Sequence, residues 1–267
     1  MSVASTARAL PTLLRVGFAE GIAYRAELVV WILSTTMPFI MLALWSAVAR
    51  DGPVGRFGQA ELTAYFLATF VVRQFTGSWI SWQMNFEIRH GTLSARLLRP
   101  VHPAIAYAAE SLAIVPIRAL AALPVVVLAL ALGVGGSLPH GTAAWLQWLV
   151  AISGAWSLGF LTSFSIGCLA FRLESSLRVM DVWLVLFWVA SGYLVPIELF
   201  PETARTILNW LPFRYQIGLP VELLTSAHDL GHGWLLVARQ WAWVSAFALL
   251  SAMLWRAGTR RYAAYGG

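Results

Sequence analysis

The sequence predicts an all-α polytopic membrane protein with six transmembrane helices. Of its 267 residues, 59% are apolar and only 11% are charged, whereas charged residues make up about 25% of an ordinary globular domain. The mean hydropathy is +0.72. The apolar residues fall into runs close to the roughly 20 residues that a helix needs to cross a bilayer. We therefore expect residues 1–267 to form a single membrane domain.

The amino-terminal residues 1–27 carry three arginines among apolar residues at near-helical spacing, namely Leu10, Leu14 and Phe18. This pattern is typical of a helix that lies in the membrane interface with its apolar side toward the lipid. A disordered basic tail is the alternative interpretation, because the apolar pattern is short.

Six spans follow from the apolar runs and the polar turns that separate them. Pro38 lies in the middle of the first run, and Pro116 and Pro124 lie inside the third, so kinks are expected at these positions. The expected spans are residues 28–48, 61–83, 104–132, 143–171, 179–199 and 234–255.

A short basic segment, residues 85–103, joins the second and third spans. Its first residues continue the preceding helix until Gly91 breaks it. Thr92 is then expected to cap a new short helix, and Pro100 to end it.

This short helix is predicted to be amphipathic. Helical spacing places Leu93 and Leu97 on one face, while Arg96 and Arg99 line another. Such a helix is suited to docking into a groove of a cytosolic partner. The alternative is a basic loop that lies at the lipid headgroups.

Small residues recur at every fourth position of the fourth span. A stripe of this kind allows a second helix to approach closely, as in small-xxx-small packing within membranes. It therefore predicts a helix interface and not a catalytic site. The stripe consists of Ala151, Ala155, Gly159, Ser163 and Gly167.

Residues 191–220 combine four prolines with many apolar side chains. The prolines exclude one straight helix, and the apolar residues are too numerous for a free loop. We expect broken helices that dip into the outer leaflet, where bent backbone is tolerated when it packs on protein. The prolines are Pro196, Pro201, Pro212 and Pro220.

Orientation follows from the arginines in the loops, since basic residues concentrate on the cytosolic side. Eleven loop arginines lie on one side and four on the other, which places both termini and the segment 85–103 in the cytosol. The eleven are Arg8, Arg15, Arg25, Arg89, Arg96, Arg99, Arg172, Arg178, Arg256, Arg260 and Arg261; the four are Arg50, Arg56, Arg205 and Arg214.

Arg73 is the one charge expected deep within a span. It follows Glu61 by 12 residues, which is roughly 18 Å along a helix axis. Arginine at that depth is costly unless it faces protein or water, so it lines a transport path or makes a structural contact between helices. Trp188 and Tyr193 are weaker candidates for the same path. Arg118, in the third span, is expected nearer the cytosolic end.

Several chemistries are excluded by composition. All 18 basic residues are arginine, so the chain has no P-loop lysine and no Schiff-base lysine. The single cysteine, Cys168, allows no internal disulfide. His228, Asp229 and His232 have metal-like spacing but are expected in a solvated loop. We therefore predict no enzyme activity, no metal and no cofactor, and we attribute the positive net charge to the membrane flanks and not to nucleic-acid binding.

Two stretches carry a resemblance to a known family: E-I-R-H-G-T-L followed by L-L-R-P at residues 87–100, and S-G…P…F-P…L-P-F-R-Y…P at residues 191–220. With the amphipathic start and six spans, they resemble the membrane subunits of type-2 ABC exporters. The closest likeness is to bacterial drug, antibiotic or viologen efflux permeases.

The resemblance implies a role for each region. Residues 1–27 would be a connecting helix on the inner leaflet, and the segment after the fifth span would cap the outer end of the path. The short basic helix would be a coupling helix seated on a separate ATPase. The residues implied in that coupling are Glu87, Arg89, Gly91, Thr92, Leu93, Arg96, Leu97 and Arg99.

It also implies partners and a location. Two permease halves, identical or homologous, would work with two ABC ATPase subunits that bind the ATP and Mg²⁺, in the cytoplasmic (inner) membrane of a bacterium. The substrate would be a hydrophobic or cationic drug-like compound. The alternatives are a permease for a lipid or glycan, a channel or scaffold without an ATPase, and a membrane enzyme, which would need clustered ionisable residues that the sequence lacks.

Overall fold

The computed structural model describes residues 3–23, 35–173, 175–225, 227–260 and 262. Most of these residues are helical, and no strand occurs among them. Three helical stretches are long and apolar enough to cross a membrane: Pro103–Ala131, Thr142–Phe171 and Leu230–Thr259. The predicted all-helical class is confirmed. The first seven residues of the expected first span, 28–34, lie outside the described residues.

Twelve α-helices are described, with short 3₁₀ turns between some of them. In chain order they are α1 (Val3–Ala23), α3 (Met37–Val48), α4 (Gln59–Thr76), α5 (Ile80–Arg89), α6 (Leu93–Leu97), α7 (Pro103–Ala113), α8 (Val115–Ala131), α9 (Thr142–Cys168), α10 (Leu177–Ala190), α11 (Glu202–Trp210), α12 (Gly218–Leu224) and α13 (Leu230–Thr259).

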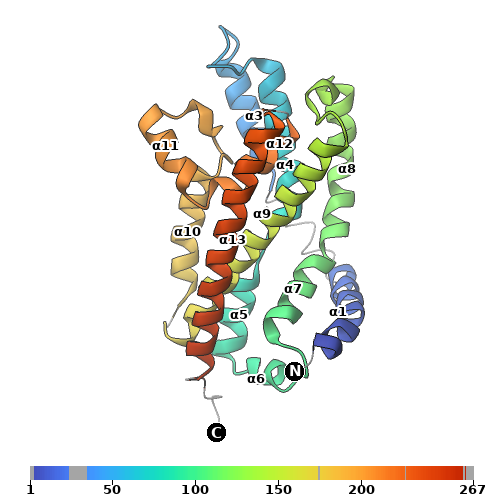
Figure 1. The fold of residues 1–267 in the computed structure, drawn as a ribbon, viewed down its shortest axis with the longest axis vertical. Coiled ribbons are helices and arrows are strands. Elements are labelled where there is room, and N and C mark those ends of the chain that lie inside the picture. Colours follow the sequence, from blue (N-terminus) through green and yellow to red (C-terminus); the bar gives the residue numbers. More distant parts are fainter. Residues whose placement is uncertain (1–2, 24–34, 174, 226, 261, 263–267) are drawn as a thin grey trace.

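Helix α9 runs through the centre of the bundle and packs along α13 on one side and against α4 and α5 on another (Figure 1). Helix α1 packs along α7, and α8 packs against α4. Helix α6 and the carboxyl-terminal end of α13 lie at one end of the molecule, and α11 and α12 lie toward the other (Figure 1).

The continuous helix expected over residues 61–83 is divided in the structure. Helix α4 ends at Thr76, Gly77 has an extended backbone conformation, and α5 begins at Ile80. The backbone groups freed by the break find side-chain partners on other helices. Arg118 donates from Nη1 to the Gly77 carbonyl at 2.9 Å, and the Ser81 amide donates to Ser163 Oγ at 3.1 Å. In an unbroken helix these two backbone groups would bond to each other.

Two further spans differ from their expected limits. Helix α10 ends at Ala190 and not at residue 199, because the chain turns at Gly192, whose φ of +86° favours glycine. Helix α13 begins at Leu230 and not at residue 234, because the Asp229 carboxylate caps it by accepting from the His232 amide at 3.1 Å. His232 therefore lies in the first turn of a helix, and the solvated loop expected there was wrong for this residue.

Residues 191–220 form broken helices, as their prolines predicted. The 3₁₀ turn Ile197–Leu199, helix α11 and the 3₁₀ turn Arg214–Gln216 follow one another before α12. Every residue of α12 is buried. An ion pair between Arg214 and Glu222 (2.6 Å) holds α12 to the preceding turn. That this end faces outward remains a prediction.

Candidate functional site

The short helix α6 lies between α5 and α7 at one end of the bundle (Figure 1). Gly91 precedes it with a φ of +74°, a backbone conformation that other residues rarely adopt. Thr92 occupies the N-cap position, but its side chain makes no capping bond to the helix. The expected capping role of Thr92 was therefore wrong.

Leu93 is fully buried and belongs to the apolar cluster of Met84, Ile88 and Tyr107. Its side chain cannot touch a partner, so the prediction of a joint Leu93 and Leu97 docking face was wrong for Leu93. The face that a short helix turns outward depends on the helices beneath it, and local spacing does not show that.

Arg96 is the centre of an ion-pair network that joins three helices. Its guanidinium lies 2.7 Å from Glu87 on α5 and 2.6 Å from Glu110 on α7. It also stacks over the ring of Tyr107, at 4.3 Å from the centroid, and the Tyr107 hydroxyl donates to Glu87 at 2.5 Å. Gln83 donates to Glu110 at 3.0 Å. Helix α6 is thereby fixed to α5 and α7 together.

Burial alone would lower the pKa of Arg96, but its bonds to Glu110 and Glu87 outweigh burial and raise the pKa above its ordinary value. Arg96 and Glu87 were expected to contact a partner. Their charges are instead compensated inside this chain, with only 14% and 13% of their side chains exposed.

Four of the residues implied in coupling are exposed at or beside α6, together with Leu98. Leu98, just after the helix, is 87% exposed, and Leu97 is 40% exposed. Thr92 and Arg99 are exposed as well. Arg89 is exposed and donates to the Leu173 carbonyl, which links α5 to the turn before α10. The exposed leucines and Arg99 form what we call the α6 tip, residues Leu97, Leu98 and Arg99.

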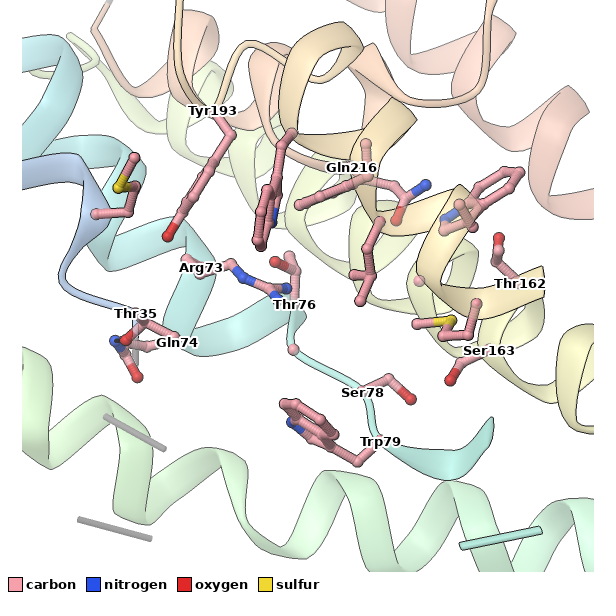
Figure 2. A pocket seen from close by; sticks show the side chains of 18 of the residues that line it. Thr35, Arg73, Gln74, Thr76, Ser78, Trp79, Thr162, Ser163, Tyr193 and Gln216 are labelled. Carbon is pink, nitrogen blue, oxygen red and sulfur yellow. Dashed lines mark hydrogen bonds between the residues drawn. The ribbon is translucent and has the colours of Figure 1, made fainter. Parts of the chain in front are cut away.

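A cavity of about 320 Å³ lies in the middle of the bundle, around the break between α4 and α5 (Figure 2). Arg73, Trp188 and Tyr193, the three candidates for a transport path, all line it. In Figure 2 the hydroxyl end of Tyr193 points toward Arg73. The structure therefore brings together three residues that lie up to 120 positions apart in the sequence (193 − 73).

Arg73 makes no ion pair or hydrogen bond in the described part of the chain; its guanidinium carbon lies 5.3 Å from the ring centroid of Phe187. Arg118 lines the same cavity and holds the Gly77 carbonyl, so its expected place near the cytosolic end was wrong. The sequence could have predicted this deeper position, because Arg118 follows Ala104, the start of the expected span, by 14 residues. That is about 21 Å along a helix.

The small-residue stripe of α9 faces α4, α5 and the segment before α12, all within this chain. A Cβ added at Gly159 would lie 3.1 Å from the Thr76 carbonyl oxygen, and one at Gly167 would lie 2.8 Å from Met84 Sδ. Ser163 accepts the Ser81 amide, and Ala155 is fully buried. The stripe allows the close approach on which the shape of the cavity depends.

At the opposite end of the bundle from α6, Glu222 is buried beneath Arg214 and His228, at 2.6 and 2.7 Å. Burial would raise the pKa of the Glu222 carboxyl, but Arg214 and His228 outweigh it and lower that pKa to about 2. No group of three acidic, histidine or cysteine side chains that could hold a metal occurs within the described ranges.

Comparison with known proteins gives one family. A family model described as "ABC-2 family transporter protein" matches residues 27–266, nearly the whole chain. No curated protein matches the sequence.

Proposed function

The chain belongs to the ABC-2 transporter family of type-2 ABC permeases, and we propose that it is the membrane-spanning permease subunit of an ATP-driven exporter. Permeases of this family are membrane transport subunits that generally work with ABC ATPases. In the proposed complex, two permease halves, identical or homologous, associate with two ATPase subunits. ATP and Mg²⁺ bind to those subunits and not to this chain.

The α6 tip is the proposed contact with the ATPase. Leu98 is almost fully exposed next to Leu97 and Arg99, and an apolar tip with a flanking charge fits a groove on a protein partner. Since Arg96 ties α6 to α5 and α7, a push on the tip moves these helices together. Glu87, Gly91 and Leu93 then position the tip, and the exposed Arg89 and Thr92 flank it.

Helix α5 connects the tip to the cavity. It spans ten residues, about 15 Å, and residues before and within its first turn, Trp79 and Trp82, line the cavity. Displacement of α6 therefore reaches the cavity through one short helix and the extended Gly77 hinge. This is a hinge-type transition of the kind that converts a local event into an altered site.

The cavity is the proposed part of the translocation path contributed by this half. Its aromatic lining suits a hydrophobic substrate. A cationic substrate, the other kind that the resemblance implied, is disfavoured because Arg73 and Arg118 would repel it. A permease for a lipid or glycan remains the alternative substrate class.

We propose six spans with both termini and α6 in the cytosol of a bacterial inner membrane, and α11 and α12 at the outer face. Two findings support this: α6 and the end of α13 share one end of the bundle (Figure 1), and the loops predicted from the sequence to be cytosolic carry eleven arginines against four in the other loops. Residues 1–27 would form the connecting helix on the inner leaflet, where α1 packs along α7.

The family match carries the proposal, and association with an ATPase tests it. The tagged permease is purified together with the products of neighbouring genes, as wild type and as the variant Leu98→Asp. The wild type should retain an ATPase, and the variant should lose it. Leu132→Asp is the matched control, because Leu132 is 59% exposed and follows α8 at the opposite end of the bundle (Figure 1). A wild type that retains no ATPase would favour a channel or scaffold instead.

A further inference from the structure

Among the residues that the structure describes, those lining the cavity around the break between α4 and α5 carry two positive charges and no negative one. Arg73 and Arg118 line it, and no aspartate or glutamate is among the lining residues in the described ranges. Arginine within a membrane protein is normally paired or solvated, because an uncompensated charge in a low-dielectric interior is costly.

Neither guanidinium is neutralised by the described residues. Arg73 stacks on the Phe187 ring, and Arg118 donates to the Gly77 carbonyl. A ring face and a carbonyl are attractive to a cation, but they carry no net charge. The two arginines therefore leave the cavity with a positive potential that an anionic group would satisfy.

Three further lining residues hold buried polar atoms without a hydrogen-bond partner among the residues described. These atoms are Ser78 Oγ, Thr162 Oγ1 and Gln216 Nε2. Hydroxyl and amide groups of this kind donate to anionic oxygens. Figure 2 shows Ser78, Thr162 and Gln216 around the same space as Arg73. Donors without partners are rare in folded proteins, and one explanation is a ligand that accepts from them.

Much of the remaining lining is aromatic. Trp82, Trp183, Phe187 and Trp188 come from α5 and α10. A volume of about 320 Å³ lies at the lower end of the range for small-molecule sites. It accommodates a body of two or three fused rings but not a large macrocycle.

We propose that this cavity binds an amphipathic anion, with its carboxylate, sulfonate or phosphate on Arg73 and Arg118 and its apolar body against the tryptophans. The inference rests on the proposed function, in that such a compound is the substrate class of the exporter. The anion is either a soluble aromatic acid or the headgroup of an anionic phospholipid.

The test compares two probes of opposite charge on the same ring system. Anthracene-9-carboxylate and 9-(aminomethyl)anthracene share one apolar body, and both accept excitation energy from nearby tryptophans. Binding is measured with the purified full-length protein in phosphatidylcholine nanodiscs. The carboxylate should bind at least about tenfold more tightly than the amine. Equal binding, or tighter binding of the amine, would overturn the proposal without any variant.

Substitutions test whether the two arginines cause the preference for the carboxylate over the amine. Arg73→Gln, and Arg73→Gln with Arg118→Gln, should each weaken binding of the carboxylate by about tenfold or more and abolish the preference. Arg73→Lys keeps the charge and should retain the preference. Arg256→Gln makes the same charge change at an exposed position near the end of α13 and should have no effect. A preference that survives the double substitution would contradict the proposal.

Two acidic residues, Glu27 and Glu174, lie outside the described residues, so Glu27→Gln and Glu174→Gln are measured as well. A preference for the carboxylate that appears only in one of these two variants would show that the cavity is already neutralised, and would overturn the proposal. Analysis of the lipid that co-purifies with the protein distinguishes a phospholipid headgroup from a soluble aromatic acid as the bound anion. A headgroup ligand predicts anionic phospholipid that the purified wild type retains and Arg73→Gln loses, whereas a soluble ligand predicts equal retention.

A failure of the anion inference is distinguishable from a failure of the proposed permease function. Probe binding requires neither ATP nor an ATPase, so loss of the ATPase association leaves it unchanged. An exporter that hydrolyses ATP but prefers the amine would refute only the anion inference.

Discussion

The Arg96 guanidinium lies 2.6 Å from the Glu110 carboxylate, although the two residues belong to different helices, α6 and α7. The same guanidinium bonds to Glu87 on α5 at 2.7 Å. One side chain therefore joins the outgoing and returning arms of the hairpin that carries the α6 tip. Removing it leaves two partly buried carboxylates next to each other without a cation.

Arg96→Gln should uncouple the tip and weaken the fold. Breaking a fully buried ion pair costs about 3–5 kcal/mol, and the partial exposure of this network places the expected loss at or below the lower end. The midpoint of thermal unfolding should fall, and substrate-stimulated ATP hydrolysis of the complex should fall more steeply than basal hydrolysis. Arg99→Gln removes the same charge from an exposed position and should leave stability unchanged. An equal loss of stability in the two variants would contradict the role of the network.

Leu93 and Leu98 should respond oppositely to truncation. Leu93 is fully buried, so Leu93→Ala should cost about 2–5 kcal/mol of stability. Leu98 is 87% exposed, and Leu98→Ala should leave stability nearly unchanged while weakening the association with the ATPase. Thermal unfolding and quantitative co-purification measure the two effects. If Leu93→Ala proves stable and selectively loses the ATPase, the assignment of the contact face is wrong.

Gly159 should tolerate a methyl group less well than Gly167. A Cβ at Gly159 meets the Thr76 backbone oxygen at 3.1 Å, whereas a Cβ at Gly167 meets the flexible side chain of Met84. Gly159→Ala should therefore cost about 1–3 kcal/mol, in the range for overpacking, and Gly167→Ala should cost less. Gly136→Ala is the control, because nothing lies within 4 Å of its added Cβ. The order of the unfolding midpoints in a common detergent checks this prediction.

Acid should remove the stabilisation that Glu222 provides. Its pKa in the fold is lowered to about 2, below the ordinary value of about 4.3. A carboxyl with a depressed pKa stabilises the fold above its unfolded pKa and loses this effect as pH falls toward the folded pKa. The difference in unfolding midpoint between wild type and Glu222→Gln should therefore be greatest near neutral pH and shrink between about pH 5 and pH 2.

The control for this titration is Glu202→Gln, at an exposed position in the first turn of α11. Its difference from wild type should stay small across the same pH range. A Glu222→Gln difference that is constant with pH would show that the carboxylate does not provide the effect.

The helical class, the broken segment after α10 and the close packing of α9 followed from the sequence, because they depend on composition, prolines and small residues within one segment. The break at Gly77 could not be predicted in this way. It is stable because Arg118 and Ser163, from two other helices, bond to the backbone groups it frees, and partners so distant in sequence leave no local pattern.

The α6 segment shows the same limit at the level of single residues. Spacing identified a short amphipathic helix, but not which of its faces is covered. Leu93 is buried by α5 and α7, and the partners of Arg96 are two carboxylates on those helices. Arg73, Trp188 and Tyr193 were each singled out for their place in a span or near a bend, and their meeting in one cavity depends on the packing of α10 against α9.

Accessibility of the α6 tip tests the proposed coupling most directly. Cys168 is the only cysteine of the chain, so Cys168→Ser with Leu98→Cys provides a single reporter thiol. A membrane-impermeant maleimide should label it in inverted membranes but not in intact cells, and bound ATPase should protect it. Labelling in intact cells, or labelling in inverted membranes that the ATPase does not reduce, would contradict a cytosolic tip seated on an ATPase.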